Sequence, residues 1–216
     1  MIHESDSVPG RVNKWAGRFA KKVAVSFVEA ADYFPKKVVA WTGQPIRTEI
    51  EHPAKRDEAF KYFKLESDVP VILILGGSQG AEIINNTILD ALPRLLENYQ
   101  IIHQTGVNNY KIVSGRADVV LTDNKNKLRY LSRPFLNPLA IRMASGVATV
   151  IVSRAGSTLF EIASWGIPSI LIPFNQSNAD HARKNAFNYA RAGGCSVVEE
   201  LNMTANILSG EIERMT

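Results

Sequence analysis

The sequence contains a single cysteine, Cys195, among 216 residues. One thiol cannot form an internal disulfide, and neither a second cysteine nor a histidine cluster accompanies it, so the sequence gives no disulfide framework and no metal site. Cys195 opens a predicted strand, "CSVVEE", where we expect a small buried side chain.

Long apolar runs are also missing. No run approaches the roughly 18 uninterrupted apolar residues that span a bilayer, and the first thirty residues lack the charged start and apolar block of a signal peptide. We therefore expect a cytoplasmic protein. At 45% hydrophobic residues, the chain can bury one good core and the edge of a second.

Acidic residues are scarce at the beginning of the chain. Residues 1–40 carry seven basic residues against four acidic ones, the basic ones being Arg11, Lys14, Arg18, Lys21, Lys22, Lys36 and Lys37. A helical stripe of Val12, Trp15, Ala16, Phe19 and Val23 lies opposite the basic side chains. We expect this stripe to pack on a domain core; contact with an anionic membrane surface is the alternative, and no nucleic-acid partner is expected.

Short β-branched runs alternate with amphipathic segments along the chain. Strands are predicted at 23–27, 38–41, 71–75, 100–104, 127–131, 149–153, 169–172 and 196–199. Helices are predicted at 12–20, 54–64, 81–98, 108–116, 138–145, 157–165, 180–192 and after 204. This alternation predicts an α/β fold with a doubly wound parallel sheet covered on both faces.

A boundary is expected near residue 43, where "WTGQPIRTEIEHPAK" interrupts the alternation with proline, glycine and mixed charge. We interpret residues 43–51 as a linker. Residues 1–42 hold too few elements for an independent core and are interpreted as the end of a domain, whereas 52–216 form the main domain and stop within a last helix.

A glycine-rich loop, "GGSQG" at residues 76–80, lies between a buried strand and a helix. In a parallel sheet such loops collect ligands, because glycine permits close backbone approach and unpaired N–H groups at a helix start attract anions. A phosphate or diphosphate is the predicted ligand, with the Ser78 hydroxyl as a hydrogen-bond donor. A tight turn without a ligand is the alternative. The loop matches neither a P-loop nor a complete G-x-G-x-x-G sequence.

A second loop of this design follows the strand ending near residue 153. Ser157 or Thr158 is expected to satisfy the free N–H groups of the next helix, or to leave them for a phosphate. Glu161 lies one helical turn further, where its carboxylate could accept hydrogen bonds from two ribose hydroxyls. The alternative is an exposed acidic residue that only complements the helix dipole. The polar segment "PFNQSNADHARKNAFNYARAGG" at residues 173–194 could recognise sugar hydroxyls or be a polar loop.

Together these segments resemble the MurG glycosyltransferases. "GGSQGA", "SRAGSTLFEIASWGIPSILIP" and "HARKNA" are similar to the donor-domain signatures of the family. "HESDSVPGRVNKWAGRFAKKVAVSF" resembles its "HEQN…PG…N" segment, and "TGQPIR" its "GNPVR" linker.

The resemblance implies half of a GT-B enzyme, a Rossmann-like donor domain with a partial second domain. The implied activity is inverting transfer of N-acetylglucosamine from UDP-N-acetylglucosamine to undecaprenyl-diphospho-N-acetylmuramoyl-pentapeptide, lipid I, giving lipid II for peptidoglycan synthesis. It implies no cofactor, a peripheral position on the inner face of the bacterial cell membrane, and a further acceptor domain or partner subunit.

The resemblance also assigns binding residues. Arg47 corresponds to the linker arginine that contacts the donor, and Leu136 to a position that packs on uracil and offers backbone hydrogen bonds. The remaining donor-binding residues are expected to be Ser78, Gln79, Ser157, Thr158, Glu161, His181 and Asn185.

Three departures from the family pattern bear on this assignment. The glutamine that contacts the sugar in the family is Ala182 here, and the asparagine of "HEQN" is Asp6. The family's "GGTGGH" loop, with the histidine implicated as general base, is absent, so the catalytic residue is unknown and the isolated chain is expected to be inactive.

Other readings stay open at this point. The chain could be one subunit of a split UDP-sugar glycosyltransferase or a non-catalytic UDP-sugar-binding module. The "GGSQGA" and "RAGSTLFE" pair argues against a UDP-sugar 2-epimerase. A dinucleotide oxidoreductase is least favoured, because no acidic residue stands where one would hold the ribose, about 20 residues after the first glycine loop.

Overall fold

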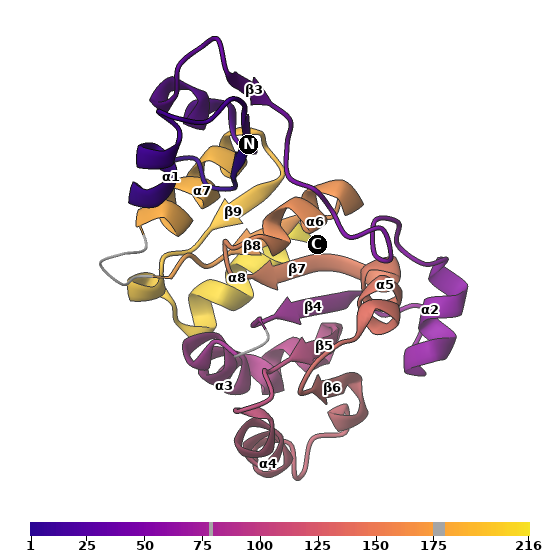
Figure 1. The fold of residues 1–216 in the computed structure, drawn as a ribbon. Helices are drawn as coiled ribbons and strands as arrows, with labels where there is room; N and C mark the ends of the chain where they lie inside the picture. The colour runs from indigo at the N-terminus through magenta and orange to yellow at the C-terminus, as the bar shows by residue number, and fades with distance from the viewer. Residues whose placement is uncertain (78–79, 175–179) are drawn as a thin grey trace.

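The computed structural model describes residues 1–77, 80–174 and 180–216. These described residues form two parallel sheets, one with three strands in the order β1-β2-β3 and one with six in the order β6-β5-β4-β7-β8-β9 (Figure 1). The strands are β1 (Ile2–Glu4), β2 (Val23–Val25), β3 (Val39–Trp41), β4 (Val71–Leu75), β5 (Gln100–Gln104), β6 (Tyr130–Arg133), β7 (Ala148–Ser153), β8 (Ser169–Leu171) and β9 (Cys195–Val197).

Helices connect these strands. They are α1 (Arg11–Ala16), α2 (Arg56–Phe63), α3 (Glu82–Asn98), α4 (Tyr110–Val120), α5 (Pro138–Val147), α6 (Thr158–Trp165), α7 (Asp180–Arg191) and α8 (Ala205–Met215). Three short 3-10 helices are described as well, η1 (Val28–Tyr33), η2 (Lys127–Arg129) and η3 (Glu200–Asn202). The predicted doubly wound parallel fold is confirmed.

The larger sheet is buried on both faces. In β4, Ile72 and Ile74 face the core beneath α3, α4 and α8, whereas Val71, Leu73 and Leu75 face the core beneath α2, α5 and α6. A strand that buries both faces needs an unbroken apolar run, which explains why "VILIL" shows no alternation. Among the described residues, no helix combines the length and apolar character needed to cross a membrane.

The beginning of the chain differs from the prediction. The helix predicted at 12–20 ends at Ala16, and the apolar stripe does not pack on a core, because Val12 is 77%, Trp15 64% and Phe19 74% exposed. The helix instead faces its sheet with Gly17, whose Cα lies against the ring of Phe34. The stripe hypothesis is therefore wrong for these three residues.

Asn13 sets the rotation of the same helix. Its side-chain amide donates to the carbonyl oxygen of His3 at 3.3 Å and to Oε2 of Glu4 at 2.9 Å, both in β1. Asn13 and Gly17 are four residues apart and so share one helical face, which leaves Trp15 and Phe19 on the outside. Strand β1 itself was not predicted, because three residues are too few for a period-two pattern.

The strand predicted at 127–131 begins later, after η2. The Asn126 N–H donates to Oδ1 of Asn124 at 2.8 Å, a local side-chain turn that favours a bend over an extended strand. Helix α4 also begins and ends later than predicted. At the other sheet edge, Cys195 is half-buried, and burial raises the pKa of its thiol to about 11.

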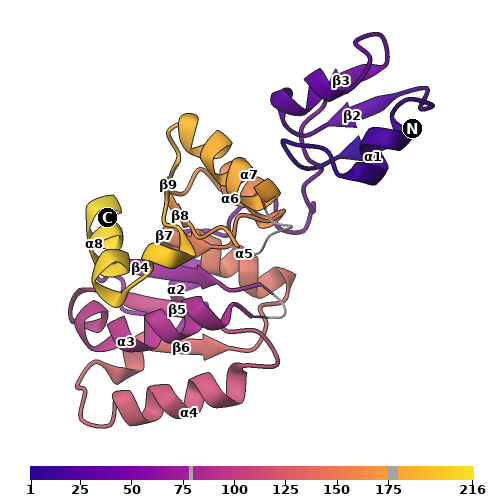
Figure 2. The ribbon, with the colours of Figure 1, turned by 90° about the vertical axis from the view of Figure 1, so that its left-hand side faces the viewer.

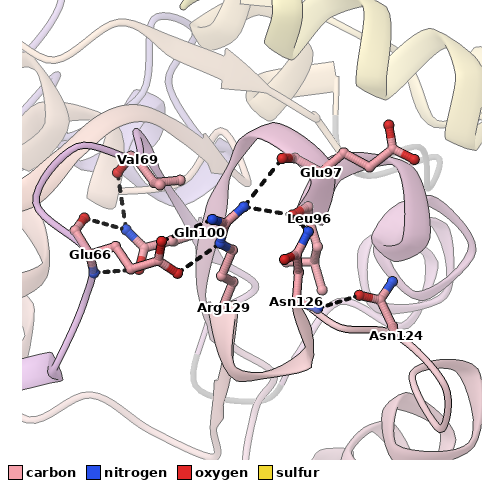
Figure 3. A network of polar contacts seen from close by, with 8 residues as sticks. All are labelled: Glu66, Val69, Leu96, Glu97, Gln100, Asn124, Asn126 and Arg129. Atoms are coloured by element: carbon pink, nitrogen blue, oxygen red, sulfur yellow. Dashed lines mark hydrogen bonds and ion pairs between the residues drawn. The ribbon is translucent and has the colours of Figure 1, made fainter.

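A polar network fixes the segment that leads into β4 (Figure 3). Gln100 is 1% exposed. Its side chain accepts from the Glu66 N–H at 2.8 Å and donates to the carbonyl oxygens of Glu66 at 2.8 Å and Val69 at 3.0 Å. Arg129 pairs with both carboxylate oxygens of Glu66 at 2.8 and 2.9 Å, and this guanidinium lowers the pKa of Glu66. The network joins the starts of β4, β5 and β6.

Candidate functional site

A cavity of about 270 Å³ lies between the two predicted loops. Its described lining residues are Gly76, Gly80, Arg154, Ala155, Gly156, Phe174 and Ala182. They follow the carboxyl ends of β4, β7 and β8 or belong to α7. Figure 2 shows β4 pointing toward the side of the molecule on which the smaller sheet lies.

The strand order explains why a cavity forms here. From β4 the chain proceeds outward through β5 to β6, whereas β7, β8 and β9 extend the sheet in the opposite direction. The two connections therefore leave β4 and β7 on opposite faces and open a crevice at their carboxyl ends. Ligands in open parallel sheets bind at such a switch point.

The glycine loop packs tightly on the neighbouring strand end. The Gly76 N–H donates to the carbonyl oxygen of Gln104 at 3.2 Å. Gly80 has φ +81°, and a Cβ there would collide with the Thr105 carbonyl oxygen and the Asn109 side chain. Only glycine fits this position. Ser78 and Gln79 lie outside the described residues.

The second loop leaves the start of α6 without a side-chain cap. Ser157 is the N-cap residue, but within the described part of the chain its side chain makes no capping hydrogen bond. The expectation that Ser157 satisfies the helix N–H groups is therefore wrong, because its φ of −60° and ψ of −26° are already helical. Thr158 is the first residue of α6, so the first N–H groups of that helix adjoin Gly156 and the cavity.

Glu161 and Arg47 form an ion pair between distant parts of the sequence. Arg47 Nε and Nη2 donate to the two carboxylate oxygens of Glu161 at 2.9 and 3.2 Å. Both residues were predicted to contact the donor, and the fold brings them together from 114 positions apart. The Glu161 side chain is 14% exposed and that of Arg47 53%. The bidentate pair orients the Glu161 carboxylate, whose remaining lone pairs can accept hydroxyl groups.

Leu136 is a buried residue, 3% exposed. Its N–H donates to Oε1 of Gln104 at 3.0 Å and is thus used inside the protein. The following Asn137 caps α5 by accepting from the Ala140 N–H at 2.8 Å. The predicted role of Leu136 in offering backbone hydrogen bonds is therefore restricted to its carbonyl group.

His181 and Asn185 contact the beginning of the chain. His181 Nδ1 lies 2.8 Å from the carbonyl oxygen of Val8. Asn185, 5% exposed, accepts from the Ser7 N–H at 2.8 Å and donates to Oδ1 of Asp6 at 2.9 Å. These two residues, predicted to contact the sugar, join α7 to the segment that follows β1.

A buried network beneath the glycine loop was not predicted. His103 is 0% exposed; its Nε2 lies 3.0 Å from Oδ1 of Asn85 and its Nδ1 2.9 Å from the Tyr130 hydroxyl. Asn85 also donates to the Thr105 carbonyl oxygen at 3.0 Å, so its Oδ1 is the acceptor and His103 carries its proton on Nε2. Burial lowers the pKa of His103 to about 3.

Arg154 and Phe174 also line the cavity without having been predicted. A usable signal was their position, since Arg154 directly follows β7 and Phe174 lies three residues after β8, at the sheet edge where the glycine loops lie. Among the described residues, no group of three or more His, Cys, Asp or Glu side chains is placed to hold a metal ion.

Residues 71–216 match the family model described as the glycosyltransferase family 28 C-terminal domain. The chain belongs to this family. Among its family 28 relatives, the Pediococcus pentosaceus protein is 37% identical over 217 residues, which cover 100% of this chain and 58% of that protein. The Acetivibrio thermocellus protein is 36% identical over 98% of this chain and 56% of its own.

Both relatives carry the name UDP-N-acetylglucosamine--N-acetylmuramyl-(pentapeptide) pyrophosphoryl-undecaprenol N-acetylglucosamine transferase. This family 28 chain thus spans little more than half the length of the curated relatives it matches.

Solved structures agree with the family assignment. The crystal structure of Acinetobacter baumannii MurG superposes with a TM-score of 0.73 at 26% identity, over 99% of this chain and 57% of that one. A UDP-N-acetylglucosamine 2-epimerase with 16% identity and a TM-score of 0.57, over 86% of this chain and 47% of that one, shares the fold alone. The expected GT-B architecture is confirmed.

Proposed function

We propose that this chain is the donor-binding part of an inverting transferase that moves N-acetylglucosamine from UDP-N-acetylglucosamine to lipid I. In this proposal residues 1–42 belong to the acceptor domain, 43–51 form the linker and 52–216 bind the donor. The observation that carries the proposal is the cavity at the switch point between two glycine loops, with the Arg47–Glu161 pair on α6, the helix that follows Gly156.

The parts of the site suit the parts of a sugar nucleotide. The positive dipole end at the start of α6 and glycines that admit close backbone approach favour a diphosphate. The oriented Glu161 carboxylate favours a ribose diol. Ser78, Gln79, His181 and Asn185 remain predicted donor contacts.

Calorimetric titration tests this proposal. The folded chain is expected to bind UDP-N-acetylglucosamine saturably and to bind NADH much more weakly. Glu161→Ala is expected to weaken UDP-N-acetylglucosamine by about 10- to 100-fold, because hydrogen bonds to a charged group contribute about 1.5–3 kcal/mol.

The matched control is Glu213→Ala. Glu213 forms a bidentate ion pair with Arg94 at 2.8 to 3.1 Å, like that of Glu161, but on α8 and α3. Its loss should leave donor binding unchanged. Equal affinity of the Glu161→Ala variant and the unmodified chain would exclude Glu161 from the donor site, and no binding by the folded chain would refute the donor-binding function.

We further propose that the exposed face around α1 contacts an anionic membrane on the cytoplasmic side, where the undecaprenyl-linked acceptor would reside. Trp15 and Phe19 are exposed and contact each other, with ring centroids 5.4 Å apart. Exposed basic residues surround them, namely Arg11, Lys14, Arg18, Lys21 and Lys22. Aromatic side chains beside basic ones are typical of surfaces that bind anionic lipid.

Vesicle sedimentation tests this surface. Binding to vesicles with anionic lipid is expected to exceed binding to neutral vesicles and to fall as salt rises. Trp15→Ser with Phe19→Ser should weaken it at least about 10-fold, since burying one such side chain contributes about 1.5–3 kcal/mol. Leu128→Ser is the control, because Leu128 is 85% exposed and lies in η2, which leads into the larger sheet. Equal losses in the two variants would refute this surface.

A further inference from the structure

Arg154 separates two cavities at the carboxyl edge of the larger sheet. It directly follows β7, and with Phe174 and Gly80 it borders both the cavity between the loops and a second one of about 530 Å³ beside α3. The other described residues of this second cavity are Ala81, Glu82, Ile83, Asn86, Thr87, Asp90 and Glu200.

The two cavities differ in charge. Three carboxylates line the cavity beside α3, those of Glu82, Asp90 and Glu200. Among the described residues that line the cavity between the loops, Arg154 is the one charged residue. Arg154 borders both cavities, but the three carboxylates line only the cavity beside α3, so the cavity between the loops suits an anion better.

Arg154 is held firmly in place. Its Nη1 pairs with Oε1 of Glu200 and also donates to the carbonyl oxygen of Ile172 at 3.3 Å. Its guanidinium lies over the ring of Phe174, with Cζ 5.4 Å from the ring centroid. The side chain is 21% exposed. The guanidinium is thus held through Nη1 and by the Phe174 ring, and these contacts fix its orientation toward the cavity.

The described hydrogen bonds of Arg154 all use Nη1, whereas a guanidinium carries five N–H donors in a fork that matches phosphate oxygens. We propose that Arg154 binds the diphosphate of the sugar nucleotide, and that Glu200 and Phe174 are positioning residues that present its guanidinium to the cavity. This inference rests on the proposed donor-binding function. It makes Arg154 the cation that stabilises negative charge on the leaving diphosphate.

The role of Arg154 is tested by titrating UDP, UMP and uridine. Arg154→Gln is expected to weaken UDP at least 10-fold and uridine less than 2-fold, and to flatten the dependence of UDP affinity on salt. Arg154→Lys keeps the charge but lacks the forked donor group, so its UDP affinity should lie between those of the unmodified chain and Arg154→Gln. If Arg154→Gln does not fold, Arg154→Lys provides the same test. Arg94→Gln, which breaks the remote ion pair with Glu213, should change none of the three affinities.

The outcomes separate the two proposals. UDP binding by the unmodified chain with an undiminished affinity in Arg154→Gln would overturn the role of Arg154 and leave donor binding intact. Equal losses for UDP and uridine would show that Arg154 only supports the fold, and would also overturn it. Failure of the unmodified, folded chain to bind UDP would refute donor binding, and this inference with it.

Discussion

Lowering the pH from 6.5 to about 3 is expected to reduce the free energy of unfolding by about 5 kcal/mol through His103 alone, since its pKa falls from 6.5 to about 3 on folding. In the unfolded chain His103 takes up a proton below about pH 6.5, whereas the folded protein keeps it neutral. The unfolded state therefore binds more protons throughout this window, and acid favours it. Above pH 6.5 the residue is neutral in both states and contributes no pH dependence.

The buried network explains why the folded protein resists this protonation. Nδ1 of His103 accepts from the Tyr130 hydroxyl, so a proton on Nδ1 would require the phenol to rotate and accept instead. The charged imidazolium would also lie buried, which is the main cause of its low pKa. Nε2 already donates to Asn85. Burial also raises the pKa of Tyr130, so the phenol cannot supply a compensating negative charge.

Urea unfolding between pH 7 and 5.5 measures this effect above the pH range in which ordinary carboxylates titrate. The slope expected from His103 approaches about 1.4 kcal/mol per pH unit. His103→Gln retains an N–H donor and should flatten the slope. His52→Gln, at an exposed histidine, should leave it unchanged. A slope that survives in His103→Gln would refute the assignment.

Gly146→Ala is expected to destabilise the protein by about 1–2 kcal/mol, because the cost of overpacking exceeds the roughly 0.5–1 kcal/mol that alanine gains over glycine in a helix. Gly146 lies in α5, and a Cβ there would collide with the carbonyl oxygen of Ala54 and approach its carbonyl carbon to 3.1 Å and its nitrogen to 3.3 Å. These are backbone atoms, and the Ala54 N–H is held by the Arg142 carbonyl oxygen at 2.9 Å. Inserting a methyl group into such packing costs about 1–3 kcal/mol, because no flexible side chain can move away.

Gly115 provides the matched control. It also lies inside a helix, α4, but nothing stands within 4 Å of a Cβ built there. Gly115→Ala should therefore stabilise the protein by about 0.5–1 kcal/mol through helix propensity. The two substitutions are chemically identical, so opposite signs in thermal unfolding would isolate the contact with Ala54. Equal effects of the same sign would contradict the packing assigned to Gly146.

The larger sheet could be predicted because strands buried on both faces need apolar residues at every position, and such runs are visible in the sequence. Runs such as "VILIL" must be apolar throughout, and Gly76 and Gly80 are required by close contacts with the end of β5 and the residues that follow it. The place of Glu161 in the helix after the second loop could also be predicted, because the order of strand, loop and helix is a local feature of the sequence.

Contacts between distant segments could not be predicted in this way. The Arg47–Glu161 pair and the His103 network depend on which strands become neighbours, and sequence periodicity does not specify this. "QIIHQ" reads as an ordinary strand, although its histidine is fully buried. The stripe around Trp15 shows the opposite failure, because helical periodicity cannot tell an apolar face that is buried from one that is exposed.

The bonds from Asn185 to Asp6 and Ser7 have a consequence for synthesis on the ribosome. Ser7 and Asn185 are 178 positions apart, so the start of the chain emerges long before its partner on α7 exists. At roughly 5–20 residues per second, that interval is about 10–35 s. During it the smaller sheet cannot contact α7. The join between the two sheets is therefore among the last interactions available to the growing chain.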